Sequence, residues 1–141
     1  MYINQAQIKK MILKEAESRV SKGILKRLQD EGEQLAAELI DKTKIILEIK
    51  DKKTLTDIEL DMAIRMNQIN VNTKPCYNII RKGSIDRLIR DQGILRHSMK
   101  LTENLINIIE NYLQSRIQKA LLVRDLRGRE TLLAEDLDFN V

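Results

Sequence analysis

The sequence predicts an all-α protein built from two tandem copies of one helical unit, which pair within the chain around a shared core. Five Gly and one Pro among 141 residues, with 43% hydrophobic and 33% charged residues, are typical of long helices joined by short loops. Apolar residues recur every three or four positions over two long stretches, which is the helical period. The chain also matches itself when it is shifted by 77 positions, which indicates that the unit occurs twice.

The internal repeat needs no gap. Arg19 and Ser21 align with Arg96 and Ser98, and the shift preserves chemical type more than identity. The other matched pairs are Ile8 with Ile85, Lys10 with Arg87, Ile12 with Ile89, Lys52 with Arg129, Thr54 with Thr131, and Glu59 with Asp136. The first copy therefore spans residues 1–68 and the second spans residues 84–141. Residues 69–83 contain the sole Pro and several Asn, which predicts a connector between the copies.

In the first copy, a short helix is predicted over residues 6–15 and a long helix over residues 22–49. Ser21 is a favourable N-cap for the long helix, and Thr54 is expected to cap a third, short helix. The two short helices carry apolar residues that are candidates for the core, namely Ile8, Met11 and Ile12 in the first, and Leu55, Ile58, Met62 and Ile64 or Met66 in the third.

The second copy repeats this order. A short helix is predicted over residues 84–92, and Gly93 can adopt the left-handed conformation that ends it. Ser98 is expected to cap a long helix over residues 99–125, and Thr131 to cap a last helix that contributes Leu132, Leu133 and Leu137. No strands are expected beyond pairings between loops.

Composition excludes several classes of function. The single cysteine, Cys76, excludes an internal disulfide and an all-Cys metal cluster. Aromatic residues make up only 3% of the chain and Trp is missing, which argues against stacking on single-stranded bases. The sequence shows no membrane-spanning run, signal-peptide pattern, Gly-rich phosphate loop or nucleophile–base arrangement. We therefore expect a soluble, intracellular protein that is not an enzyme and uses no metal, cofactor or small-molecule substrate. His97 is interpreted as an incidental polar loop residue.

The repeated pattern resembles the histone fold, and archaeal histones in particular. In the second copy the resemblance lies in residues 84–93, in Arg96 and Ser98, and in residues 127–137. In the first copy it lies in Ile8, Lys10 and Ile12, and in residues 19–21 and 52–60. The resemblance implies two units that cross antiparallel, the histone handshake, here joined in one chain. One unit alone would leave the apolar face of its long helix exposed, whereas two can bury both faces against each other.

The resemblance also implies which residues contact double-stranded DNA. In a handshake, the loop after the first helix of one copy lies beside the loop before the third helix of the other. Arg19 then meets Thr131, and Arg96 meets Thr54, giving two edge sites that present a guanidinium, a hydroxyl and backbone N–H groups to phosphate. Between these sites, Lys10 and Arg87 correspond to cations that the family directs into the minor groove. The remaining candidate DNA-binding residues are Ser21, Lys53 and Ser98.

Two further pairs, Lys52 with Glu59 and Arg129 with Asp136, look like the family's clamp between loop and helix. The chain also departs from the family pattern. Glu130 stands where a loop Lys is expected, which predicts weaker DNA binding at that edge and an asymmetric footprint. Ile49 and Leu126 replace the histidine of the contact that joins neighbouring histone pairs, so the sequence does not support that polar contact.

The predicted function is therefore that of an architectural protein of the chromosome or nucleoid, which bends, wraps and compacts double-stranded DNA largely without sequence preference. Further copies of the chain, or single-copy histones, are candidate partners on DNA. The alternative is a histone-fold interaction module of a transcription or chromosome-associated complex, whose main partner is protein. The modest net charge of +4, Glu130 and the apolar Ile49 and Leu126 favour that alternative.

Overall fold

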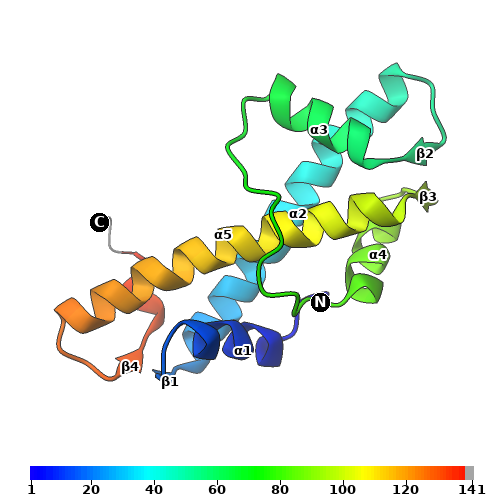
Figure 1. Cartoon of the computed structure of the whole chain (residues 1–141). Coiled ribbons are helices and arrows are strands. Elements are labelled where there is room, and N and C mark those ends of the chain that lie inside the picture. Colours follow the sequence, from blue (N-terminus) through cyan, green and yellow to red (C-terminus); the bar gives the residue numbers. More distant parts are fainter. Residues whose placement is uncertain (139–141) are drawn as a thin grey trace.

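The computed structural model describes residues 1–138 and is predominantly helical (Figure 1). The first unit contains α1 (Gln5–Glu15), β1 (Arg19–Val20), α2 (Lys22–Ile49), β2 (Thr54–Leu55) and α3 (Asp57–Met66). The second contains α4 (Lys82–Asp91), β3 (Arg96–His97), α5 (Met99–Leu126), β4 (Thr131–Leu132) and η1 (Ala134–Leu137), a single 3-10 turn. The order is thus the same in both units, except that the described part of the second ends on this turn instead of an α-helix.

The long helices α2 and α5 cross at the centre of the molecule (Figure 1). Gly32 of α2 lies at the crossing, where a Cβ atom would stand 3.4 Å from the Cγ2 of Ile109 and 3.3 Å from the Cδ1 of Leu113 on α5. The missing side chain therefore lets the helices approach closely. Buried residues from both units form one continuous hydrophobic cluster, including Ile8 and Leu28 from the first and Ile85, Leu105, Ile109 and Leu113 from the second. The prediction of two units sharing a core is confirmed.

The predicted N-caps of the long helices are also confirmed. The Oγ of Ser21 accepts a hydrogen bond from the N–H of Ile24 at 3.3 Å, and the Oγ of Ser98 accepts one from Leu101 at 3.1 Å. Gly93 follows α4 with φ +90°, a backbone conformation that glycine adopts without steric cost. These caps are local interactions, which is why the sequence alone could place them.

The predicted caps of the third helices are wrong. Thr54 lies in β2, and α3 is capped by Thr56, whose side chain accepts from Ile58 while Glu59 completes a capping box. Thr131 lies in β4, and Leu133, which precedes η1, makes no side-chain cap hydrogen bond. The physical reason is the same in both units. Thr54–Leu55 and Thr131–Leu132 are extended, and each pairs with the loop of the other unit. They cannot also begin a helix.

This shift of the start of α3 changes which residues it buries. Leu60 and Ala63 are fully buried, whereas Ile58 is mostly exposed, contrary to its assignment as a core candidate. Of the alternatives Ile64 and Met66, Ile64 packs against the core and Met66 is exposed. Leu55 is buried as expected, although it lies in β2 and not in the helix. Within α3, Glu59, Leu60 and Ala63 form the buried face, and Ile58 lies outside it.

The connector packs along α5. The carboxylate of Glu110, itself fully buried, accepts hydrogen bonds of 2.8–3.1 Å from the N–H groups of Tyr77, Asn78, Ile79 and Ile80. The side chain of Asn111 donates to the carbonyls of Asn72 and Lys74 in the same segment. No helix within residues 1–138 is both long and apolar enough to cross a membrane.

Candidate nucleic-acid interface

Two loop pairings lie at opposite ends of the crossed helices (Figure 1). The first edge is the parallel pair β1–β4, in which Arg19 faces Thr131. The second edge is the parallel pair β2–β3, in which Thr54 faces Arg96. Each pairing joins one unit to the other. One more backbone hydrogen bond extends each pairing in the same way. The N–H of Ser21 donates to the carbonyl of Leu132 at 3.0 Å, and that of Ser98 donates to the carbonyl of Leu55 at 2.9 Å.

The structure therefore brings together the residue pairs that the sequence analysis combined at each edge. Arg19, Arg96 and Lys53 are exposed, and within residues 1–138 their side chains make no hydrogen bond or ion pair. Thr54 is exposed, and Thr131 is half-buried. Each edge thus presents a cation beside a hydroxyl, with extended backbone between them. Free cations and hydroxyls at a fixed spacing are groups that can hold phosphate oxygens.

The clamps behind the edges are formed as well. The guanidinium of Arg129 lies 2.6 Å from the buried carboxylate of Asp136, and the ammonium of Lys52 lies 3.6 Å from that of Glu59. Each carboxylate also has a second cation that the sequence analysis missed: Lys50 lies 3.2 Å from Glu59, and Arg127 lies 3.2 Å from Asp136. Lys50 and Arg127 keep the 77-residue spacing, which was a usable signal.

Burial alone would raise the pKa of Glu59 above its ordinary value of 4.5, but hydrogen bonds from Lys50 and Thr56 outweigh burial and lower this pKa. The carboxylate therefore stays ionised and holds its cations in the loop that carries Thr54. In the first unit the clamp also anchors α3, because the Glu59 carboxylate accepts a hydrogen bond from the N–H of Thr56.

The central pair, Lys10 and Arg87, is not symmetric. The Nη2 of Arg87 donates to the carbonyl of Met1 at 2.7 Å, and its guanidinium stands 5.2 Å from the centre of the Tyr2 ring. Lys10 is exposed and has no such partner within residues 1–138. Sequence reasoning treated the two as equivalent, but the N-terminal residues occupy only the Arg87 side.

Comparisons with known proteins address the fold. No family model matches the sequence, and no curated protein sequence matches it. The structure is similar to that of the histone from Methanopyrus kandleri, with a TM-score of 0.75 at 21% sequence identity. The match covers 94% of this chain and 89% of that chain, so it includes both units. The chain has the histone fold. The crossing of α2 with α5 is the handshake, here made within one chain.

His97 has a structural role in the second histone-fold unit, which corrects its interpretation as an incidental residue. Its Nε2 lies 2.8 Å from the Oδ1 of Asp86, and the same oxygen accepts a hydrogen bond from the hydroxyl of Thr102 at 2.7 Å. Burial raises the pKa of Asp86, but these two hydrogen bonds outweigh it and lower the pKa below the ordinary value of 3.8. The cluster ties α4 and β3 to α5. No signal in the sequence could have joined these three residues.

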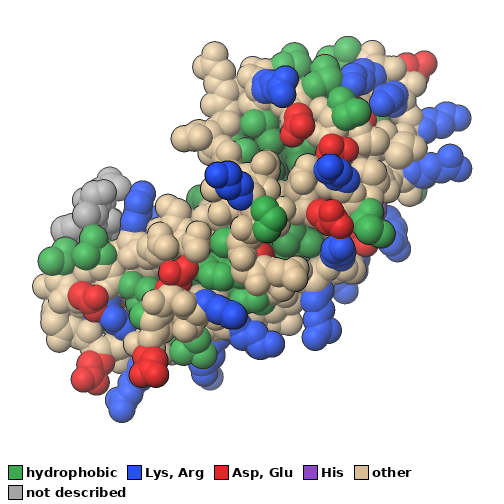
Figure 2. Space-filling view, viewed as in Figure 1, with side chains coloured by type: hydrophobic (Ala, Val, Ile, Leu, Met, Phe, Trp, Pro, Cys, Tyr) green, Lys and Arg blue, Asp and Glu red, His purple; other side chains and the backbone are tan. Residues whose placement is uncertain are grey.

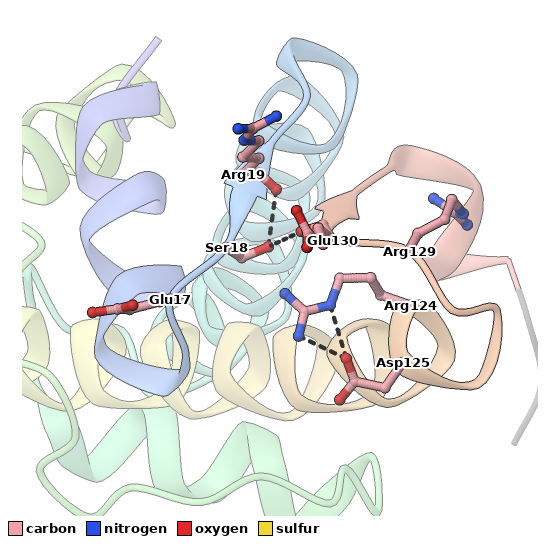
Figure 3. Close-up of a pocket in the computed structure, with 7 residues that line it drawn as sticks. All are labelled: Glu17, Ser18, Arg19, Arg124, Asp125, Arg129 and Glu130. Atoms are coloured by element: carbon pink, nitrogen blue, oxygen red, sulfur yellow. Dashed lines mark hydrogen bonds and ion pairs between the residues drawn. The ribbon is translucent and has the colours of Figure 1, made fainter.

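A shallow pocket adjoins the first edge of the histone fold (Figure 3). Its lining residues are Glu17, Ser18, Arg19, Arg124, Asp125, Arg129 and Glu130. The hydroxyl of Ser18 bonds the carbonyls of Arg19 and Glu130, at 2.9 and 3.3 Å, and so links β1 to the loop before β4. Arg124 and Asp125 form an ion pair of 2.7 Å. The lining thus carries three arginines, Arg19 included, and three carboxylates.

Proposed function

We propose that this chain is a DNA-binding architectural protein, which bends, wraps and compacts double-stranded DNA largely without sequence preference. Its place would be on the chromosome. The observation that carries the proposal is the pairing of Arg19 with Thr131 and of Arg96 with Thr54, at two sites related by the internal repeat. The likeness of the fold to a histone supports it.

The chemistry of the edges suits phosphate and not bases. A guanidinium, a hydroxyl and backbone N–H groups bind phosphate oxygens, which have the same form at every base pair, so such contacts position the duplex without reading its sequence. Two edge sites at opposite ends of the crossed helices can hold two separated points of a duplex. DNA that reaches both must follow the surface between them, and Lys10 lies exposed on α1 in that central region. Bending then follows from the spacing of the contacts.

The test is the salt dependence of binding to duplexes of unrelated sequence. With roughly six cations engaged, the affinity should fall about a thousandfold between about 50 and 200 mM salt, because each phosphate contact releases a counterion. Affinities for AT-rich and GC-rich duplexes should agree closely. Incubation with relaxed plasmid and topoisomerase should leave supercoils if the chain wraps DNA. A flat salt response would contradict the proposal.

A second candidate is a protein-interaction module, and one observation favours it. Ile45 and Ile49 lie one turn apart on α2, their counterparts Leu122 and Leu126 lie one turn apart on α5, and all four are exposed. Phe139, a further apolar residue of the sequence, lies outside the described residues. These matched apolar ends suit contact with further copies of the chain or with other histone-fold proteins. Salt-independent association between protein chains, without DNA binding, would support this candidate.

A further inference from the structure

The two edges pair their backbones in the same way, but the pockets beside them differ in charge. Glu17 and Glu130 stand at the first edge, and the positions that match them at the second are Ile94 and Lys53. The pocket beside the first edge is lined by three arginines and three carboxylates. The pocket beside the second is lined by Lys53 and Arg96 with apolar neighbours and has no carboxylate.

The arginines of the first edge are also engaged within the protein. Arg124 pairs with Asp125 at 2.7 Å, and Arg129 pairs with Asp136 at 2.6 Å. This leaves Arg19 as the cation of that pocket without a partner among residues 1–138. At the second edge, neither Lys53 nor Arg96 has a side-chain partner among residues 1–138.

The neighbouring exposed residue adds to this difference. Leu95 precedes Arg96 and is 88% exposed, whereas the hydroxyl of its counterpart Ser18 hydrogen-bonds to two backbone carbonyls. An apolar side chain beside two free cations neither repels phosphate nor competes for the cations. In Figure 2, several Lys and Arg side chains project from the end that carries β2 and β3, with some acidic side chains beside them, and acidic and basic side chains lie side by side at the end that carries β1 and β4.

We propose that the chain holds duplex DNA asymmetrically, with the second edge, at Arg96, Lys53 and Thr54, as the primary anchor. The first edge then makes a weak contact, because Glu17 and Glu130 repel phosphate next to Arg19. This inference rests on the proposed function and assigns unequal roles to two sites that the repeat makes equivalent. A duplex engages at the second edge first and reaches the first edge only as it bends.

The experiment compares Arg96→Ala with Arg19→Ala on one duplex, by fluorescence anisotropy over a range of salt concentrations. Arg96→Ala should weaken binding about tenfold and reduce the salt slope by about one, as expected for one lost phosphate contact. Arg19→Ala should weaken binding less than about threefold, with little change in slope. Both side chains are exposed and unpaired, so the thermal melts of the two variants should match that of the parent.

A converse variant tests the cause. The double variant Glu17→Ile, Glu130→Lys gives the first edge the charges of the second edge. It should bind DNA more tightly than the parent, and Arg19→Ala in this background should weaken DNA binding as much as Arg96→Ala does. Equal losses for the two arginine variants in the original chain, with salt-dependent binding intact, would overturn the asymmetry and leave the proposed function standing. Absence of salt-dependent binding in the parent would overturn both.

Discussion

Glu33 of α2 and Glu110 of α5 lie 77 positions apart, and each holds the backbone of the segment that leads into the first helix of its unit. The carboxylate of Glu33 accepts hydrogen bonds from the N–H groups of Tyr2 and Ile3, at 2.7 and 2.8 Å. That of Glu110 accepts them from four successive residues of the connector. The buried side chains that follow, Ile3 and Ile80, are also 77 apart. The repeat thus extends further than the sequence comparison found, into the connector itself.

Replacing Glu110 should therefore loosen the connector and destabilise the fold. Glu110→Gln keeps the shape but replaces one acceptor oxygen with a donor, so two of the four N–H groups lose their partner. We expect a loss of about 1–3 kcal/mol in the free energy of unfolding, measured by urea denaturation. The matched control is Glu103→Gln, because among residues 1–138 the side chain of Glu103 forms only an exposed ion pair with Lys82. That variant should change stability by less than about 0.5 kcal/mol, and an equal effect of both variants would contradict the role of Glu110.

Substitutions at two glycines, Gly32 at the crossing of α2 and α5 and Gly83 in α4, should have opposite effects on stability. Gly32→Leu should destabilise the protein by about 1–3 kcal/mol, because its side chain would collide with Ile109 and Leu113 at the helix crossing. Gly83 lies in α4, and a Cβ there meets nothing within 4 Å. Gly83→Ala should therefore raise stability by up to about 1 kcal/mol, through better helix propensity. Thermal melts of the two variants check both signs, and a stable Gly32→Leu variant would mean that the helices do not cross at this point.

Stability should fall in acid, and the lowered pKa values of Glu59 and Asp86 set the direction. A carboxyl whose pKa is lower in the folded state contributes stability that is present above its unfolded pKa and is lost as the pH falls through the folded pKa. For these residues the loss begins below the ordinary values of 4.5 and 3.8. The free energy of unfolding should thus be nearly flat around neutral pH and decline below about pH 4.5.

Variants locate the source of this pH dependence. Asp86→Asn should be less stable than the parent at neutral pH, and the difference should shrink as the pH falls below the ordinary carboxyl value of 3.8 and the parent carboxyl takes up its proton. Urea denaturation at several pH values measures the difference. Glu48→Gln, at an exposed position without a side-chain partner in residues 1–138, should follow the parent throughout. A constant gap between Asp86→Asn and the parent would refute the contribution of Asp86.

Because the handshake forms within one chain, pairing of the units should not depend on protein concentration. Light scattering of dilute protein should give a particle near 16.4 kDa. Its melting temperature should not change with dilution, unlike that of a complex between separate chains. Each unit expressed alone should fail to fold as a stable monomer, since α2 or α5 would expose its apolar face. A half that folds stably alone would show that the shared core is not required.

Some of the interface could be predicted from the sequence because its signals are local or repeated. Ser21 and Ser98 were identifiable as caps because a cap bonds within three residues of itself. The partners Arg19 with Thr131 and Arg96 with Thr54 followed from the resemblance to a known arrangement, and the structure has both pairs in register.

By itself, the sequence determined the two-unit helical architecture, the span of α2 and the caps of both long helices, because helical periodicity and capping are properties of neighbouring residues. Only the tertiary structure decided where α3 begins, since Thr54 and Leu55 are drawn into pairing with Arg96 and His97, far along the chain. It likewise decided that Arg87 is occupied by the N-terminal residues and that the carboxylates of the first edge gather around Arg19. Such contacts depend on which segments the crossed helices bring together, and the local pattern of residues does not indicate which segments those are.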